Sequence, residues 1–323
     1  MSKKWRSSAI TSSGPKGKVI SLNPIRFLMS ALIDGKEISK AILEEVRSEV
    51  HALQAKGLVP KLKVILVGED PASISYVTGK ARTAQEVGMD AETIRLPSTT
   101  DQHDLVNLIN RLNADVSVHG ILVQSPLPDH LSEGQVFRAI SPMKDVDCLH
   151  PENVGLLALG TPRVVPCTPM GILELLLRSG NSPEGKHVVI IGRSSLVGRP
   201  LSILLSLKRT GSNATVTLCH SSTRELKRYT LQAEVLVAAI GAADAIKKDM
   251  VPEGCVVIDV GINRIPDPSK RSGFRLVGDV DFEEVLPRVK AITPVPGGVG
   301  PMTVAMLMKN SVRLARLQTG DGI

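Results

Sequence analysis

Lys186-His-Val-Val-Ile-Ile-Gly-Arg-Ser-Ser-Leu-Val-Gly198 is a short apolar run that leads into a turn between two glycines. The run up to Gly192 predicts a buried β-strand, and the apolar spacing from Val197 to Ser206 predicts an α-helix. A strand, a glycine-bounded turn and a helix in this order are typical of the first unit of a dinucleotide-binding fold, where main-chain N–H groups at the start of the helix bind a pyrophosphate. Ser194 replaces the middle glycine of the strict G-x-G-x-x-G pattern, so a plain strand-to-helix turn remains the alternative.

Segments of the same two kinds alternate on both sides of this unit. Apolar runs predict strands over residues 63–68, 91–96, 119–124, 214–219, 234–241 and 255–261. Helical spacing occurs over residues 38–58, 73–87, 105–112, 171–179 and 304–317. This alternation predicts an α/β protein with parallel sheets and helical crossovers. Because it forms two series that meet near residues 150–170, we expect two α/β domains with an interdomain cleft, the second domain being Rossmann-like.

The composition of the 323 residues suits two packed domains, since 42% of them are hydrophobic. No apolar run reaches the roughly 18 residues of a membrane helix. The formal net charge is +7, but six basic residues and no acidic residue lie within residues 1–28. The other 33 basic and 32 acidic residues leave a net charge of +1, so we expect no nucleic-acid-binding face and no membrane partner. Four widely spaced cysteines, and no His pair at metal-ligand spacing, predict a reduced, metal-free intracellular protein.

Residues 1–28 are rich in Ser, Lys and Gly. Acid-poor segments rich in Arg and Ser occur as mitochondrial presequences, but this one has two arginines and little amphipathic pattern. We therefore expect a disordered leader, the product of an upstream start or a cloning remnant, with the globular protein beginning near Met29. A cytoplasmic location follows, with mitochondrial import as the alternative.

The end of the second strand of the dinucleotide unit bears on the choice of cofactor. NAD-binding folds place an Asp or Glu about 20 residues after the turn, against the ribose hydroxyls. Here the strand ends Leu218-Cys-His-Ser221, without an acid. Arg193 and Ser221 are suited to a ribose phosphate, which favours NADP over NAD. The alternative for Arg193 is a cap on a surface helix.

Tyr76 and Lys80 lie four residues apart on a predicted helix and therefore share a face, as many ordinary surface pairs do. Three features favour a catalytic site. Gln124 ends a predicted strand before a Ser-Pro-Leu-Pro stop, at the carboxyl edge of a sheet, where open α/β sheets bind ligands. The loop Lys144-Asp-Val-Asp147 presents two carboxylates, and Pro166-Cys-Thr-Pro169 joins the two series with rigid chain, as a cleft requires.

Pro294-Val-Pro-Gly-Gly-Val-Gly-Pro-Met-Thr303 contains three prolines and three glycines. We expect such a run to form neither regular helix nor strand. Because it precedes a predicted helix, its free N–H groups suit close contact with a flat or anionic small molecule. An ordinary interdomain turn is the alternative.

Together these segments resemble the bifunctional methylenetetrahydrofolate dehydrogenase/methenyltetrahydrofolate cyclohydrolase family. The resemblance spans roughly residues 30–318 and rests on six motifs, in the family's order and at consistent separation: Tyr76-x-x-x-Lys80, Val123-Gln124-x-Pro-Leu-Pro128, Lys144-Asp-Val-Asp147, Pro166-Cys-Thr-Pro169, Gly192-Arg-Ser-x-x-Val-Gly198 and Pro296-Gly-Gly-Val-Gly-Pro-Met-Thr303. It implies NADP-dependent oxidation of 5,10-methylenetetrahydrofolate to 5,10-methenyltetrahydrofolate, and hydrolysis of that product to 10-formyltetrahydrofolate. These reactions belong to one-carbon metabolism and serve purine biosynthesis.

The resemblance also implies a layout and partners. Residues 29–168 would form the N-terminal α/β catalytic (folate) domain, completed by a C-terminal helix over residues 301–323. Residues 169–300 would form the Rossmann-like NADP-binding domain. Tetrahydrofolate derivatives, with or without a polyglutamate tail, would be the partners, and a homodimer through the nucleotide domain would be the assembly.

Residue roles follow from the same resemblance. Lys80 looks like the general acid/base of the cyclohydrolase step, because a neutral amine can accept a proton from attacking water and a cationic substrate favours that neutral form. Gln124 would orient Lys80, Tyr76 would stack on the folate, and Asp147 would accept hydrogen bonds from the pterin, with Asp145 structural. The further substrate-binding residues implied are Val123, Pro296, Gly297, Gly298, Val299 and Thr303. The cofactor-binding residues implied are Gly192, Arg193, Ser194, Val197, His220, Ser221, Gly241, Gly261 and Ile262, with the last two near the nicotinamide.

The chain departs from the family pattern at Cys148, where we expect glycine. If that position requires a positive φ, cysteine either costs about 1 kcal/mol there or adopts another geometry, which would alter the placement of Asp147. Ser125, after Gln124, is a smaller departure that should be tolerated.

Two competing functions use some of the same residues. A short-chain dehydrogenase also combines a Tyr-x-x-x-Lys pair with NADP, but there the pair follows the glycine-rich turn, whereas Tyr76 precedes Gly192 by more than a hundred residues. A non-catalytic NADP-binding or regulatory module would not need Lys80, Gln124 and Asp147 together.

Overall fold

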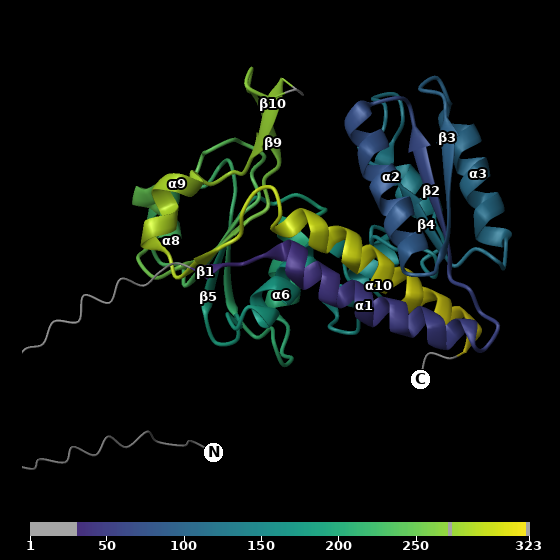
Figure 1. The fold of residues 1–323 in the computed structure, drawn as a ribbon, viewed down its shortest axis with the longest axis horizontal. Helices are drawn as coiled ribbons and strands as arrows, with labels where there is room; N and C mark the ends of the chain where they lie inside the picture. Colours follow the sequence, from purple (N-terminus) through teal and green to yellow (C-terminus); the bar gives the residue numbers. More distant parts are fainter. Residues whose placement is uncertain (1–30, 271–272, 321–323) are drawn as a thin grey trace, which may run out of the picture.

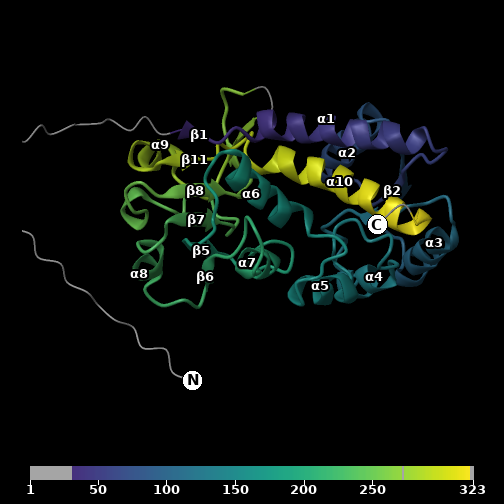
Figure 2. The ribbon, with the colours of Figure 1, turned by 90° about the horizontal axis from the view of Figure 1, so that it is seen from below.

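The structure, a computed structural model, describes residues 31–270 and 273–320. It has two α/β lobes, and the long helices α1 (Gly35–Gln54) and α10 (Val299–Thr319) start at the second lobe and run side by side along the first (Figures 1 and 2). The leader expected at residues 1–28 lies outside the described residues. Along the described chain, no helix has the length and apolar character needed to cross a membrane.

The first lobe is built on a three-stranded parallel sheet in the order β3-β2-β4. Helix α2 connects β2 to β3 and helix α3 connects β3 to β4, which is the crossover that parallel strands require. All of β4 is buried, as expected of a parallel strand covered on both faces. The elements are β2 (Lys61–Val67), α2 (Pro71–Glu86), β3 (Asp90–Leu96), α3 (Gln102–Ala114), β4 (Gly120–Val123), α4 (Glu133–Ala139) and α5 (Pro151–Ala158).

The second lobe is built on a six-stranded parallel sheet in the order β1-β11-β8-β7-β5-β6. Three of the runs predicted as strands become the inner strands β5, β7 and β8, and the run over residues 214–219 becomes β6 at the edge of the sheet. Strands β7 and β8 are buried throughout. A two-stranded hairpin, β9 with β10, projects from this lobe (Figure 1). The elements are β1 (Ala31–Leu32), α6 (Cys167–Arg178), β5 (His187–Ile191), α7 (Gly198–Ser206), β6 (Thr215–Cys219), α8 (Leu226–Thr230), β7 (Val235–Ala238), a 3-10 turn (Lys248–Met250), β8 (Val256–Asp259), β9 (Asn263–Pro266), β10 (Phe274–Val277), α9 (Phe282–Val285), a 3-10 turn (Leu286–Arg288) and β11 (Ala291–Ile292).

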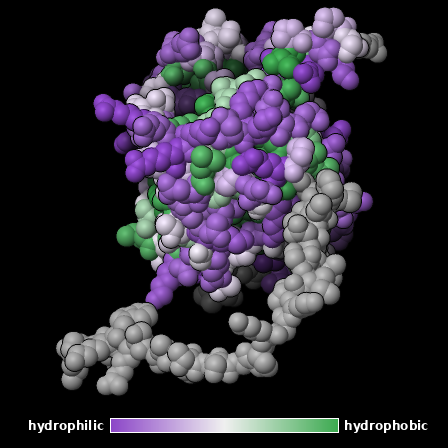
Figure 3. Space-filling view, turned by 90° about the vertical axis from the view of Figure 1, so that its left-hand side faces the viewer, coloured by the Kyte–Doolittle hydropathy of each residue, from purple (hydrophilic) through white to green (hydrophobic). Residues whose placement is uncertain are grey.

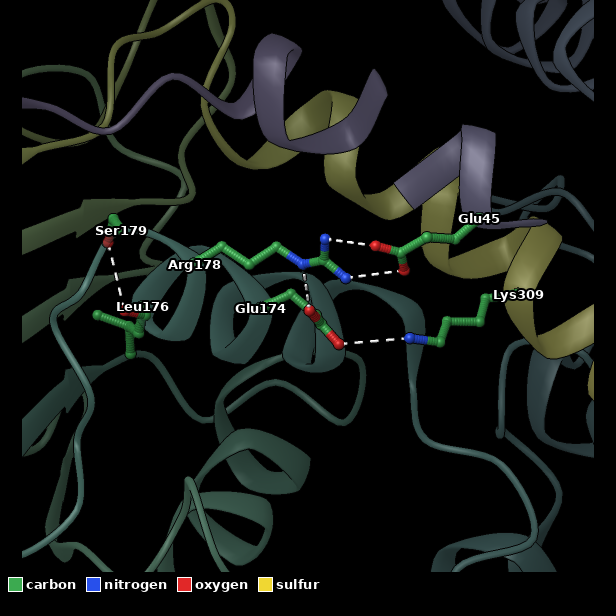
Figure 4. A network of polar contacts seen from close by, with 6 residues as sticks. All are labelled: Glu45, Glu174, Leu176, Arg178, Ser179 and Lys309. Atoms are coloured by element: carbon green, nitrogen blue, oxygen red, sulfur yellow. Dashed lines mark hydrogen bonds and ion pairs between the residues drawn. The ribbon is translucent and has the colours of Figure 1, made fainter. Parts of the chain in front are cut away.

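A charged network fastens the long helices to the second lobe (Figure 4). The guanidinium of Arg178 on α6 makes two parallel hydrogen bonds to Glu45 on α1, at 2.7 and 2.9 Å. Its Nε donates to Glu174 at 2.8 Å, and Glu174 also pairs with Lys309 on α10 at 3.4 Å. The network therefore joins three helices through one bidentate arginine.

One sequence expectation, the start of the last helix, differs from the structure. Helix α10 begins at Val299, so the second half of the proline- and glycine-rich run is helical. Pro301 is tolerated there because the first turn of a helix leaves its N–H groups without intrahelical partners. Ala31–Leu32, just before α1, pairs with β11 in the second sheet.

Figure 3 shows the end of the molecule formed by the second lobe. Hydrophilic side chains predominate on this face, and apolar residues appear there in small, separate groups.

Candidate active site

A cavity of about 410 Å³ lies between the lobes. Tyr76, Lys80 and Gln124 reach it from the first lobe, Val260 and Ile262 from the second, and the first turn of α10 closes a third side. An adjoining cavity of about 270 Å³ shares Tyr76 and Ile262 and extends along the proline- and glycine-rich run. Lys80 therefore faces the crevice between the lobes rather than bulk solvent.

The amine and the amide at the centre of this cavity are in contact. Lys80 Nζ donates a hydrogen bond to Gln124 Oε1 at 2.9 Å, and Gln124 Nε2 donates to Ser125 O at 2.5 Å. The second bond fixes the amide with its oxygen toward the lysine. The hydrogen bond expected between Lys80 and Gln124 is thus present. The main chain just after β4 fixes its geometry by holding the Gln124 amide.

Helix α2 holds Tyr76 and Lys80 on one face. The helix starts at Pro71 behind Asp70, whose carboxylate accepts the Ser73 N–H at 2.8 Å as an N-cap. Tyr76 is 46% exposed, so its ring offers a face to the cavity that it lines. Both side chains therefore project into the cleft from a helix with a well-defined start.

The two carboxylates of the loop after α4 lie in different environments. Asp145 is buried and accepts N–H bonds from Leu149 at 3.1 Å, His150 at 2.8 Å and Asn153 Nδ2 at 2.9 Å. Burial raises the pKa of Asp145, and these hydrogen bonds oppose the rise. Asp145 holds the loop, which leaves the half-buried Asp147 available to a ligand.

Lys144, the first residue of this loop, has a structural role. Its buried ammonium donates to the carbonyl oxygens of Leu112 at 3.0 Å, Asn113 at 2.8 Å and Asp115 at 2.7 Å, at the C-terminal end of α3. The ammonium thus pairs with carbonyls that the helix itself cannot satisfy.

Cys148 keeps the left-handed conformation that a glycine would take there, with φ of 59°. Its buried thiol donates to Val164 O at 3.3 Å. Of the two outcomes expected for a cysteine here, the chain therefore shows the positive φ rather than another geometry.

Two residues of the interdomain segment lie next to the expected site residues, Cys167 in the core and Thr168 at the larger cavity. Burial and the neighbouring charge of Asp147 raise the pKa of the Cys167 thiol, and Lys80 is close enough to oppose that effect. Thr168 lines the larger cavity and shares a 3.1 Å hydrogen bond with Thr303 Oγ1 on α10. The Pro-Cys-Thr-Pro segment was the available signal for both.

The glycine-bounded turn lies at the carboxyl edge of the second sheet. Gly192 has φ of 120°, and a Cβ there would lie 2.0 Å from Ala239 O. A Cβ on Gly198 would lie 1.8 Å from Gly192 O. Only glycine fits either position, and Ser194 Oγ accepts the Val197 N–H at 3.1 Å within the turn.

The residues expected to choose the cofactor meet at this edge. Ile191 and Cys219 are register partners in β5 and β6, so Arg193 and Ser221 follow neighbouring strand ends. Both are exposed, while His220 is half-buried and its Nδ1 accepts the Ser222 N–H at 3.2 Å. A cation and a hydroxyl are thus available to one anionic group.

The remaining expected residues lie at the other end of the site, with one exception. Gly261, Ile262, Pro296, Gly297, Gly298 and Val299 line the smaller cavity, and Val299 and Thr303 line the larger one. Gly241 is exposed at the end of β7. The side chain of Val123 instead packs in the core of the first lobe and is 3% exposed.

Of the described residues, Asp101, His103 and Asp104 have ligand atoms close enough together for a metal ion. They are exposed at the start of α3 and line neither cavity of the cleft.

Two family models match the chain. The catalytic domain of tetrahydrofolate dehydrogenase/cyclohydrolase matches residues 33–147, and the NAD(P)-binding domain of the same family matches residues 166–319. The bifunctional protein FolD of Prosthecochloris aestuarii is 54% identical over 285 residues, which cover 87% of this chain and 97% of that protein. The FolD protein of Salinibacter ruber is 54% identical over 287 residues, covering 89% and 96%.

Solved structures give the same result. The bifunctional FolD methylenetetrahydrofolate dehydrogenase/cyclohydrolase of Campylobacter jejuni superposes with a TM-score of 0.84 at 47% identity, covering 89% of this chain and 99% of that one. The Trypanosoma brucei methylenetetrahydrofolate dehydrogenase-cyclohydrolase, solved with NADP cofactor and an inhibitor, has a TM-score of 0.85 at 38% identity, covering 90% and 98%.

Proposed function

The chain belongs to the tetrahydrofolate dehydrogenase/cyclohydrolase family, and from this premise we propose how its cleft performs the two reactions. The protein is a bifunctional enzyme with NADP as its cofactor. It oxidises 5,10-methylenetetrahydrofolate to 5,10-methenyltetrahydrofolate and hydrolyses this product to 10-formyltetrahydrofolate.

The second lobe fits a dinucleotide. The turn between Gly192 and Gly198 has no room for a Cβ at either end, and the first turn of α7 contains no acid that would repel phosphate. We assign the pyrophosphate to this turn, with Ser194 and Val197 beside it. Arg193, His220 and Ser221 would hold the ribose phosphate, and Gly241, Gly261 and Ile262 the nicotinamide end.

In the oxidation step the main task of the protein is to position the folate and the cofactor. The bound cofactor supplies the hydride acceptor, and no protein acid or base is required. Tyr76 would hold the folate by stacking, and Asp147 would accept hydrogen bonds from its pterin. The first turn of α10, with Val299 and Thr303, would press the substrate toward Ile262 on the second lobe.

The hydrolysis step is assigned to Lys80. A neutral amine beside a cationic methenyl ring can accept a proton from the attacking water and return it as the ring opens. The 2.9 Å hydrogen bond from Lys80 Nζ to Gln124 Oε1 carries this assignment, because it fixes the amine within the cavity between the lobes.

Replacing Lys80 tests the assignment. We expect Lys80→Met to lose methenyl hydrolysis by about a hundredfold or more, the usual size of a general acid–base contribution, while folate and NADP still bind. Arg82→Met is the matched control, because Arg82 lies on the same helix with an exposed side chain. Undiminished hydrolysis in the Lys80 variant would overturn the role of this lysine.

The contacts of α10 bear on the division of the chain into domains. We propose that residues 29–168 and 301–323 form the catalytic domain and residues 169–300 the nucleotide domain. In support, Asn310 on α10 donates to Val146 O and Val165 O, both at 2.8 Å, and Gln318 donates to His119 O at 2.8 Å. The pairing of β1 with β11 carries the first residues of the chain's described part onto the other sheet.

We also propose a homodimer through the nucleotide domain. Strand β6 lies at the edge of the second sheet and, among the described strands, pairs with β5 alone. Its other edge can hydrogen-bond to a second copy. Light scattering on the protein as it elutes from a size-exclusion column should give twice the mass of the chain. We place the enzyme in the cytoplasm, where its formyl product would serve purine biosynthesis, and we propose that it takes tetrahydrofolates with or without a polyglutamate tail.

A further inference from the structure

Asp279 fills an anion-binding turn at the nucleotide end of the cleft. Its buried carboxylate accepts three consecutive main-chain N–H groups, from Ile240 at 2.6 Å, Gly241 at 3.0 Å and Ala242 at 3.0 Å. Asn263 Nδ2 adds a fourth hydrogen bond at 2.9 Å. Three successive N–H groups aimed at one point form a concave anion site, and here a side chain of the protein occupies it. The loop after β7 is thereby tied to the segment after β10.

Asp259 makes a second tie of the same kind one strand away. Its buried carboxylate accepts the N–H of Gly261 at 3.0 Å, Asp279 at 2.9 Å and Val280 at 3.0 Å. Its own N–H donates to Thr293 Oγ1 at 2.8 Å, immediately before the proline- and glycine-rich run. The two aspartates therefore join the loops after β7, β8, β10 and β11 into one unit.

Two glycines make room for these carboxylates. A Cβ on Gly278 would lie 1.7 Å from Asp259 Oδ2, and a Cβ on Gly261 would lie 2.2 Å from Asp279 Oδ1. Burying two acids this close together is costly, because each charge disfavours the other. Six main-chain N–H groups offset that cost, so the arrangement is a built feature rather than incidental packing.

The loops that Asp259 and Asp279 join together expose two apolar side chains. Ile240 is 41% exposed and Ile262 is 45% exposed, although both follow directly from buried strands. Asp259, Gly261 and Ile262 line the smaller cavity. An apolar surface with buried negative charge behind it suits a flat, cationic ring.

We propose that Asp259 and Asp279 are positioning residues for the nicotinamide end of NADP, and that their charge favours the oxidised, cationic form of the cofactor over the reduced one. The inference rests on the proposed placement of the cofactor. It adds two residues that act through Gly241, Gly261, Ile240 and Ile262. Removing one carboxylate should therefore weaken binding of both cofactor forms and weaken the oxidised form more.

The test compares the affinities of NADP+ and NADPH for Asp279→Asn and wild type, by fluorescence or calorimetric titration of the full chain. We expect the Kd for NADP+ to rise about tenfold and that for NADPH about threefold, since only the oxidised ring carries charge. Methenyl hydrolysis without cofactor should stay within about twofold, because Lys80 lies on the other lobe. Asp281→Asn is the matched control: Asp281 is two residues away, pairs with Lys247 and should change neither affinity.

Each other outcome is informative. Equal loss for both cofactor forms, unchanged affinities, or parallel loss of hydrolysis would each overturn the proposal. If the Asp279 variant does not fold, Ile240→Ala keeps the proposal testable, because its side chain is largely exposed. Both affinities should then fall about threefold with an unchanged ratio, and unchanged affinities would refute the role of Ile240 and Ile262 as an apolar surface for the cofactor ring. Failure of the wild type to bind NADP at all would refute the proposed function instead.

Discussion

The surroundings distinguish three aspartates that look alike in the sequence. Asp145 receives three N–H bonds and Asp279 receives four, and both are buried, so their lone pairs are committed to the protein. Asp147 stays half-buried beside Cys167, and it lines neither cavity of the cleft. The sequence could therefore predict that the loop carries two carboxylates. It could not predict which one is structural, because that depends on the N–H donors of residues 149–153.

Residue-scale prediction had a clear limit. The contact between Lys80 and Gln124 was predictable, because helix periodicity and a strand end both place side chains at one sheet edge. Asp259, Asp279 and Thr168 were not singled out, because each acts through loops that are distant in the sequence. Val123 was expected at the substrate, but as the last residue of a fully buried strand its side chain faces the core.

Cys148 allows a stability test of its backbone conformation. Cys148→Val should lower the free energy of unfolding by about 2–4 kcal/mol, because a β-branched residue is strained at positive φ and adds volume to a packed core. Urea unfolding measures the loss. Cys255→Val is the control, since Cys255 is equally buried and does not have a positive φ. Equal losses in the two variants would show that volume alone is responsible.

The buried Asp259 predicts a pH dependence of stability. Burial raises its pKa to about 6, against three N–H bonds that lower it. Because the folded state holds the proton more tightly than the unfolded chain, this contribution to stability is complete below about pH 4 and is lost as pH rises through about 6. Relative to Asp259→Asn, wild type should therefore lose about 3 kcal/mol between pH 4 and pH 7.

Urea unfolding of both proteins across this pH range gives the difference directly. Burial also lowers the pKa of His119, but that group is present in both proteins and cancels. A difference that is flat with pH would contradict the raised pKa of Asp259.

At the scale of elements, strands were predictable where an apolar run is buried on both faces. Strands β5, β7 and β8 fall within the predicted runs for that reason. Strands β1 and β11 have two residues each, which is too short for any periodic signal. Helix α10 begins five residues before the predicted start at Val304, because Pro301 lies in the first turn, where a helix tolerates proline.

The ion pairs between α1 and α6 lead to a prediction about stability. Arg178→Met should lower the free energy of unfolding by about 1–2 kcal/mol, since a bidentate, partly buried arginine is lost and Glu45 and Glu174 lose their shared cation. Arg47→Met, which breaks a more exposed pair with Glu44 within α1, should cost at most about 0.5 kcal/mol. Thermal or urea unfolding distinguishes the two. A larger effect at Arg47 would contradict the network shown in Figure 4.

At the scale of the molecule, the alternation of strands and helices predicted two α/β units and a cleft between them. It could not predict how the lobes face each other, because that depends on α1 and α10 packing together and on α6 joining them. These contacts bring Lys80 of the first lobe and Ile262 of the second to the same cavity.

We propose that one reduced folate lies between the amine of Lys80 and the nicotinamide end of the cofactor site. The most direct test is a crystal structure of the ternary complex with NADP and a folate analogue. We predict Lys80 Nζ within hydrogen-bond reach, about 3 Å, of the analogue's reacting ring or a water on it, with the nicotinamide on the opposite face beside Ile262. An analogue bound outside the cleft, or with both groups on the same side of its ring, would contradict the account.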